Sequence, residues 1–97
     1  MGGEVATSKA PAEQKRVQVT VTFYSYLKEV TGWAQTREEM NFGSTLGELY
    51  EKLIGRFPRL AAMRKSILFA VDVDYQPMDY VLKEGDEVSL FPPVQGG

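Results

Sequence analysis

The sequence contains no cysteine and no histidine among its 97 residues. Disulfides, thiolate nucleophiles, iron–sulfur clusters and histidine-based acid–base catalysis are therefore excluded. A zinc site would have to consist of carboxylates alone, which is not how proteins usually bind zinc. We therefore assign no metal to this chain, and we expect any chemistry in which it takes part to be performed by another protein.

Long apolar runs and a basic excess are also missing. No stretch approaches the roughly 20 apolar residues of a membrane span, and the start lacks the basic-then-apolar pattern of a signal peptide. Lysine and arginine number 11 against 13 aspartate and glutamate, a formal net charge of −2. Nucleic-acid binders usually carry a clustered basic excess instead. We expect a cytoplasmic protein that binds neither membrane nor nucleic acid.

The length predicts a single domain with polar ends. Residues 1–15 carry almost no large apolar side chain, so they cannot bury enough surface to offset the entropy cost of ordering. We predict a disordered extension over residues 1–15, a folded domain over residues 16–92 and a flexible tail over residues 93–97.

The hydrophobic pattern of the folded region predicts an α+β domain. Residues 17–23 alternate between apolar and polar, which is typical of a strand with one buried face. The weaker alternation over residues 33–42 predicts a second strand at a sheet edge, where charges discourage unwanted pairing. Apolar residues recur with helical spacing over residues 46–57, and Thr45 with Glu48 has the sequence of a capping box.

The rest of the folded region predicts shorter elements. They are helical turns over 26–31, ended by Gly32, and over 58–65; strands over 67–73 and 87–91; a short edge segment over 80–82; and turns over 74–77 and 83–86. In the first of these strands we expect Phe69, Val71 and Val73 to share one face. The element order is not the strict alternation of a doubly wound sheet, and it favours a helix crossing one face of a mixed sheet.

The chain ends on an unusual run of residues: Pro92, Pro93, Val94, Gln95, Gly96 and Gly97. Proline ends a sheet ladder and favours an extended course, and glycine has no Cβ to clash in a channel that admits only backbone. The reactive group at the tip is the α-carboxylate of Gly97, which a partner must activate, for example as an acyl-adenylate. From these residues alone, the end is either the cargo-bearing group of a carrier or an ordinary frayed terminus.

A longer stretch carries a family resemblance. Residues 85–97, GDEVSLFPPVQGG, resemble the C-terminus of the small subunits of molybdopterin synthase, a family of ubiquitin-like sulfur carriers. That family characteristically ends in a G-D-E-V strand leading into P-P-V-x-G-G, with Gln95 here at the variable position. The similarity extends in pattern over residues 17–97.

The resemblance implies a β-grasp fold, with the first and last strands adjacent and parallel at the centre of the sheet. It implies that a ubiquitin-activating-enzyme-like adenylyltransferase uses ATP to adenylate Gly97 and that a sulfurtransferase then supplies sulfur. The Gly97 thiocarboxylate would donate this sulfur to a pterin precursor in the large catalytic subunit, during molybdenum cofactor biosynthesis. By analogy the subunits form a heterotetramer, and residues 92–97 enter a pocket of the large subunit. This chain itself binds no cofactor.

Phe91 is predicted to lie on the sheet face opposite Val88 and Leu90. We interpret it as a contact with the partner beside the tail, because aromatic residues often dominate interface energetics; the alternative is a sheet that buries both faces at its end. Other functions also stay open. They are sulfur carriage for thiamine or tRNA thiolation, ubiquitin-like modification of protein lysines, and a β-grasp interaction module with an inert tail.

Overall fold

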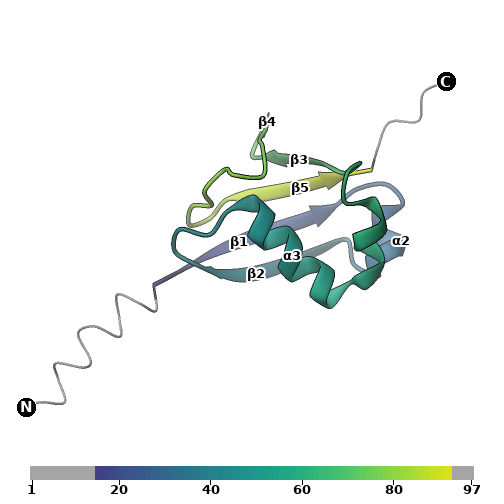
Figure 1. Cartoon of the computed structure of the whole chain (residues 1–97), viewed down its shortest axis with the longest axis horizontal. Coiled ribbons are helices and arrows are strands. Elements are labelled where there is room, and N and C mark those ends of the chain that lie inside the picture. Colours follow the sequence, from purple (N-terminus) through teal and green to yellow (C-terminus); the bar gives the residue numbers. More distant parts are fainter. Residues whose placement is uncertain (1–14, 93–97) are drawn as a thin grey trace, which may run out of the picture.

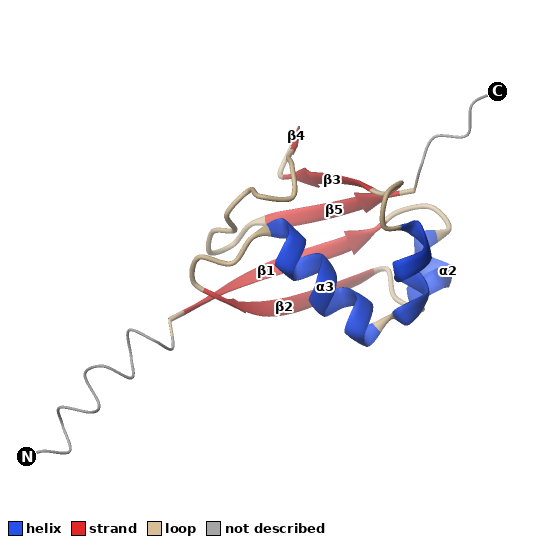
Figure 2. Cartoon of the chain, viewed as in Figure 1, coloured by secondary structure: helices blue, strands red, loops and turns tan. Residues whose placement is uncertain are grey.

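The computed structural model describes residues 15–92. They form a five-stranded mixed sheet with helices on one face (Figures 1 and 2). In chain order the elements are β1 (Arg16–Phe23), α2 (Leu27–Thr31), β2 (Gln35–Asn41), α3 (Leu46–Arg56), the 3₁₀ helix η1 (Pro58–Met63), β3 (Leu68–Val71), β4 (Asp74–Tyr75) and β5 (Glu87–Phe91). None of the helices in this part of the chain is long and apolar enough to cross a membrane.

The first and last strands lie side by side at the centre of the sheet, whose strand order is β2-β1-β5-β3-β4. β5 pairs in parallel with β1, with Val88 opposite Val21, and antiparallel with β3. Parallel strands cannot be joined by a tight turn, so the chain crosses one face of the sheet through α3 (Figure 1). This arrangement confirms the predicted α+β, β-grasp fold.

The core lies between the sheet and α3. Many of its buried members come from alternate positions of β1 and β5 and from one face of α3: Val17, Val19, Val21, Phe23, Leu46, Leu49, Tyr50, Leu53, Val88 and Leu90. The helix begins at the predicted capping box, because Thr45 Oγ1 accepts from the Glu48 N–H at 3.2 Å and Glu48 Oε1 accepts from the Thr45 N–H at 2.9 Å. Periodicity and capping together therefore predicted both the position and the buried face of α3.

A buried carboxylate joins α3 to the edge strand β2. Glu38 is only 5% exposed, and it forms an ion pair with Arg56 and a second with Lys52 at 3.6 Å. The Lys52 Nζ also donates to the backbone carbonyl of Glu39 at 2.7 Å. The α3 side chains thus satisfy the buried charge and occupy a backbone acceptor of β2, which lies at the edge of the sheet as predicted.

The strand predicted over residues 67–73 is shorter than its apolar composition indicates. β3 ends at Val71, and Asp72 adopts a φ of 58°, a conformation that aspartate tolerates better than most residues. Val73 is 90% exposed in the resulting turn, so its predicted place on the face of Phe69 and Val71 is wrong. Asp72 tolerates the positive φ of a turn, so the chain reverses there although the next residue is apolar.

Two neighbouring predictions are also wrong. The hairpin closes early, so Asp74–Tyr75 forms the short strand β4 on β3, instead of the predicted turn. The segment 80–82 lies outside the sheet, since Val81 makes only an isolated bridge with Thr45. Leu82 nevertheless enters the core at 2% exposure, which accounts for the apolar character of this segment.

Candidate functional site

The C-terminal end of β5 lies beside an aromatic cluster on the open face of the sheet, the face that α3 does not cover. Val88 and Leu90 are fully buried against α3, and Phe91 is half-buried on the opposite face, as the alternation predicted. The Phe91 ring stacks on Tyr24, with ring centroids 4.7 Å apart and planes 12° from parallel. Tyr75 meets it edge-on, with centroids 6.4 Å apart.

Three strands and the residue that follows β1 contribute to this cluster. Tyr24 follows β1, and its N–H donates to the carbonyl of Leu90 in β5 at 3.1 Å. Leu68 of β3 is the cross-strand partner of Phe91, and Tyr75 comes from β4. The exposed fractions are 42% for Tyr24, 40% for Leu68 and 69% for Tyr75. We call Tyr24, Leu68, Tyr75 and Phe91 the aromatic patch, an exposed apolar surface of the kind that marks interaction sites.

Sequence reasoning found only Phe91 among these four residues. Tyr24 does carry a signal, because it continues the alternation of β1 and must point away from the core face that holds Phe23. Tyr75 carried none, since its segment was predicted as a turn. The register between β1 and β5, which decides that Tyr24 lies against Phe91, cannot be read from either strand alone.

The predicted tail begins where the described structure ends. Pro92 directly follows β5 and is outside the strand. Pro93, Val94, Gln95, Gly96 and Gly97 lie outside the described residues, as do residues 1–14 of the predicted extension, so the predictions for these segments remain predictions. Because β5 is hydrogen-bonded to strands on both sides, the position of Pro92 relative to the aromatic patch is set by the sheet.

The described residues offer few groups for catalysis. No group of three or more acidic side chains able to hold a metal ion occurs within residues 15–92. Asp86 is buried, but it accepts hydrogen bonds from the Lys83 N–H at 2.8 Å and the Tyr80 hydroxyl at 3.0 Å. Burial and the hydrogen bond to Asp86 raise the pKa of Tyr80. This network fastens the turn before β5, at the opposite end of the strand from the tail.

The sheet order, the crossing helix and the aromatic patch beside the last strand define a protein of the ubiquitin-like β-grasp class. A profile of the ThiS family matches residues 21–97, which includes the whole C-terminal run. The chain therefore belongs to the ThiS family.

Curated relatives agree over nearly their full length. The chain is 32% identical over 83 residues to the molybdopterin synthase sulfur carrier subunit of Chlamydomonas reinhardtii, covering 84% of this chain and 100% of that protein. It is 31% identical over 83 residues to the human protein of the same name, covering 82% and 94%. Each alignment therefore covers most of both chains.

Solved structures show the same fold. The putative molybdopterin converting factor subunit 1 of Pyrococcus furiosus superposes with a TM-score of 0.75 at 26% identity, covering 80% of this chain and 99% of that one. SAMP1 of Haloferax volcanii gives 0.74 at 25% identity, covering 82% and 99%. A chain in the complex of subunits 1 and 2 of the molybdopterin-converting factor from Helicobacter pylori gives 0.61 at 26% identity, covering 84% and 100%.

Proposed function

We propose that this chain is a sulfur carrier subunit of molybdopterin synthase, with Gly97 as its cargo-bearing residue. The observation that carries the proposal is the ThiS family match, which runs through the last strand to Gly97. The two relatives, matched over 100% and 94% of their own length, are named as sulfur carrier subunits of that synthase. The described fold supports it, because β5 ends at Phe91 and the terminal run that begins at Pro92 follows directly.

In the proposed cycle, the Gly97 α-carboxylate is the only group of this chain that reacts. An adenylyltransferase partner joins the carboxylate to the AMP portion of ATP and releases pyrophosphate, which turns a poor electrophile into an activated acyl group. Hydrosulfide attacks the acyl carbon and displaces AMP, which leaves a thiocarboxylate. Where the sulfur comes from a sulfurtransferase persulfide, the attack gives an acyl disulfide, and a thiol reductant must cleave its S–S bond to release the thiocarboxylate. That sulfur passes to the pterin precursor held by the large subunit. The chain contributes delivery, and its partners contribute nucleotide, sulfur and pterin binding.

The aromatic patch is the proposed docking surface for the large subunit. A neighbour of this fold was solved as a complex of subunits 1 and 2 of a molybdopterin-converting factor. Phe91 immediately precedes Pro92, so a partner that covers the patch also lies where the tail departs. Two small and two large subunits would form the proposed heterotetramer. All partners that consume ATP or hold the pterin are cytoplasmic in this proposal, and so is the carrier.

An intact-mass measurement tests the carrier function. The protein is incubated with ATP, a cognate adenylyltransferase and a sulfide or sulfurtransferase source. Its intact mass is then measured by mass spectrometry. We expect a species about 16 Da heavier, because sulfur replaces one oxygen of the Gly97 carboxylate. A control without ATP should stay at the starting mass. An unchanged mass with an enzyme that thiocarboxylates a known carrier would refute the proposal.

A second candidate is attachment of the tail to protein lysines. It is favoured by the likeness to SAMP1, a small archaeal modifier protein, which superposes almost as well as the Pyrococcus protein. Both functions begin with activation of Gly97 and differ in the acceptor. Isolation of the chain joined through an isopeptide bond to other proteins would favour modification. Stable copurification with a molybdopterin synthase large subunit would favour sulfur delivery.

A further inference from the structure

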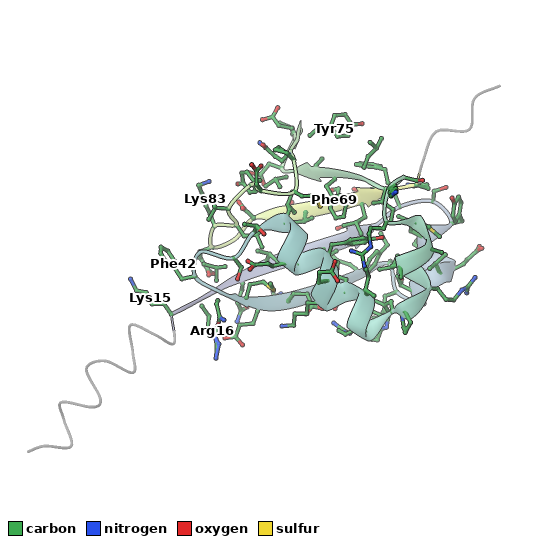
Figure 3. All side chains as sticks on the ribbon, viewed as in Figure 1. Lys15, Arg16, Phe42, Phe69, Tyr75 and Lys83 are labelled. Atoms are coloured by element: carbon green, nitrogen blue, oxygen red, sulfur yellow. The ribbon has the colours of Figure 1, made fainter. Side chains whose placement is uncertain are left out.

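A second surface lies at the end of the molecule where β1 begins, far from the C-terminal end of β5. It is a hollow of about 590 Å³ between the start of β1, the end of β2 and the loop before β5. Figure 3 shows Lys15, Arg16, Phe42 and Lys83 gathered at this end. We call it the basal hollow; it is lined by Lys15, Arg16, Val17, Phe42, Val81, Leu82, Lys83 and Glu84.

The hollow is apolar inside. Val17 and Leu82 form its floor and are 4% and 2% exposed, so they connect it to the core. Phe42 and Val81 also line the hollow and are 68% and 48% exposed. A volume of this size falls in the range of roughly 300–1,000 Å³ that ligand-binding clefts occupy. A large apolar side chain placed here would be covered on several sides.

The rim is basic. Lys15, Arg16 and Lys83 line it. Arg16 donates to the Asn41 Oδ1 at 3.3 Å and the Lys83 Nζ donates to the Tyr80 hydroxyl at 3.3 Å. Both partners are neutral groups, so these side chains keep their positive charge. The Lys15 Nζ lies 5.3 Å from the centroid of the Phe42 ring, which keeps this charge over the apolar wall.

Glu84 is the single acidic residue of the lining, and it offsets one of the three cations. Its carboxylate accepts from the backbone N–H of Gln18 at 2.9 Å. With three cations and one carboxylate, the lining keeps a positive balance. This is a local basic site on a chain whose formal net charge is −2.

We propose that the basal hollow binds a peptide segment of a partner protein, in which a large apolar side chain is flanked by carboxylates. The apolar side chain would fill the hollow, and the carboxylates would meet the three cations, an arrangement that gives specificity and speeds association. An anionic membrane is the less suitable occupant. Membrane-surface proteins insert protruding apolar side chains into the lipid, and here the apolar surface is concave.

The position of the hollow allows it to be occupied while the tail is in use. β1 and β5 are parallel and end together beside the aromatic patch, whereas the hollow lies at the start of β1. Eight strand residues at about 3.3 Å each separate the two ends by roughly 25 Å. A partner at the hollow can therefore bind without covering the aromatic patch. Since this binding does not use Gly97, it stands or falls independently of the sulfur carrier proposal.

A titration with defined peptides tests the proposal. The full-length ¹⁵N-labelled chain is titrated with the acetylated and amidated peptide Glu-Glu-Phe-Glu-Glu and followed by NMR. We expect saturable shifts of the Phe42, Val81 and Leu82 amides and unchanged Phe91. Peptides Lys-Lys-Phe-Lys-Lys and Glu-Glu-Gly-Glu-Glu should bind at least about tenfold more weakly, because each lacks one half of the recognised chemistry.

Matched variants assign the binding to the hollow. Lys15→Glu with Lys83→Glu should weaken Glu-Glu-Phe-Glu-Glu by about tenfold or more. Lys28→Glu with Lys65→Glu makes the same charge change at two exposed lysines outside the hollow and should leave most of the affinity. Equal affinity for the acidic and basic peptides, or equal loss in both double variants, would overturn the proposal.

Two other occupants give different results and would also overturn it. In the absence of peptide, Glu4→Gln with Glu13→Gln would shift the same amides if the N-terminal segment of this chain filled the hollow. Cosedimentation with phosphatidylserine vesicles that requires Lys15 and Lys83, without peptide binding, would identify a lipid surface instead.

Discussion

The rings of Tyr24 and Phe91 stack 4.7 Å apart, although one follows the first strand and the other ends the last. Parallel pairing of β1 and β5 makes this contact, and an aromatic pair of this kind contributes about 1 kcal/mol beyond the area it buries. Phe91 is therefore held in place before any partner arrives. A preordered aromatic side chain beside the tail loses little further freedom on binding, which favours its use as an interface anchor.

Replacing Phe91→Ala should weaken binding to the large subunit by about 2 kcal/mol, or roughly 30-fold in Kd. The loss is expected because the ring joins Tyr24 and Tyr75 in one exposed patch. Phe42→Ala is the matched control, since it removes an exposed ring at the other end of the sheet. Isothermal titration of both variants against the large subunit checks this. Equal losses in the two variants would show that the aromatic patch is not the docking surface.

Adding one alanine after Gly97 should abolish thiocarboxylate formation and leave the fold unchanged. The extension moves the carboxylate by one residue and places a Cβ at the tip, where the proposed channel admits backbone only. Intact mass after incubation with the adenylyltransferase measures the first effect, and thermal unfolding by circular dichroism measures the second. Full thiocarboxylation of the extended chain would contradict the proposed attachment site.

Arg56→Met should lower the free energy of unfolding by about 2 kcal/mol, because Glu38 would keep its buried charge with only Lys52 as a partner. Replacing both members, Glu38→Leu with Arg56→Leu, should recover much of the loss. Arg64→Met, which breaks the exposed pair with Glu51, should change stability little. Urea unfolding measures all three. An equal loss for Arg64→Met would show that the buried pair stabilises the fold no more than the exposed pair does.

Stability should fall as the pH rises above about 10, and Tyr50 should carry part of this fall. Burial raises the pKa of Tyr50, more than nearby Arg64 lowers it. The unfolded chain then ionises first, so the contribution is complete below the unfolded pKa and is lost as pH rises through the folded one.

Tyr50→Phe should cost about 1 kcal/mol at neutral pH, because the hydroxyl donates to the Leu60 carbonyl. The variant should also show a shallower loss above about pH 10. Urea unfolding at several pH values compares the two slopes, and parallel curves would contradict the proposed linkage.

Much of this fold could be predicted from local sequence. The alternation in β1, the helical spacing and capping box of α3 and the turn before β5 each depend on neighbouring residues, so periodicity and capping chemistry suffice to locate them. The predictions failed near Val73, where a continuous apolar run concealed a turn at Asp72. A run without alternation carries no information about where the chain reverses.

By itself, the sequence determined the α+β class, the buried faces of β1, α3 and β5, and the terminal run ending in Gly97, because these follow from residue type and spacing along the chain. Only the tertiary structure decided which strands are neighbours and in what register, since pairing between distant segments depends on the packing of the whole core. That register placed Tyr24 and Tyr75 against Phe91. It also brought Phe42, which follows β2, and Val81 with Lys83, from the loop before β5, around one hollow.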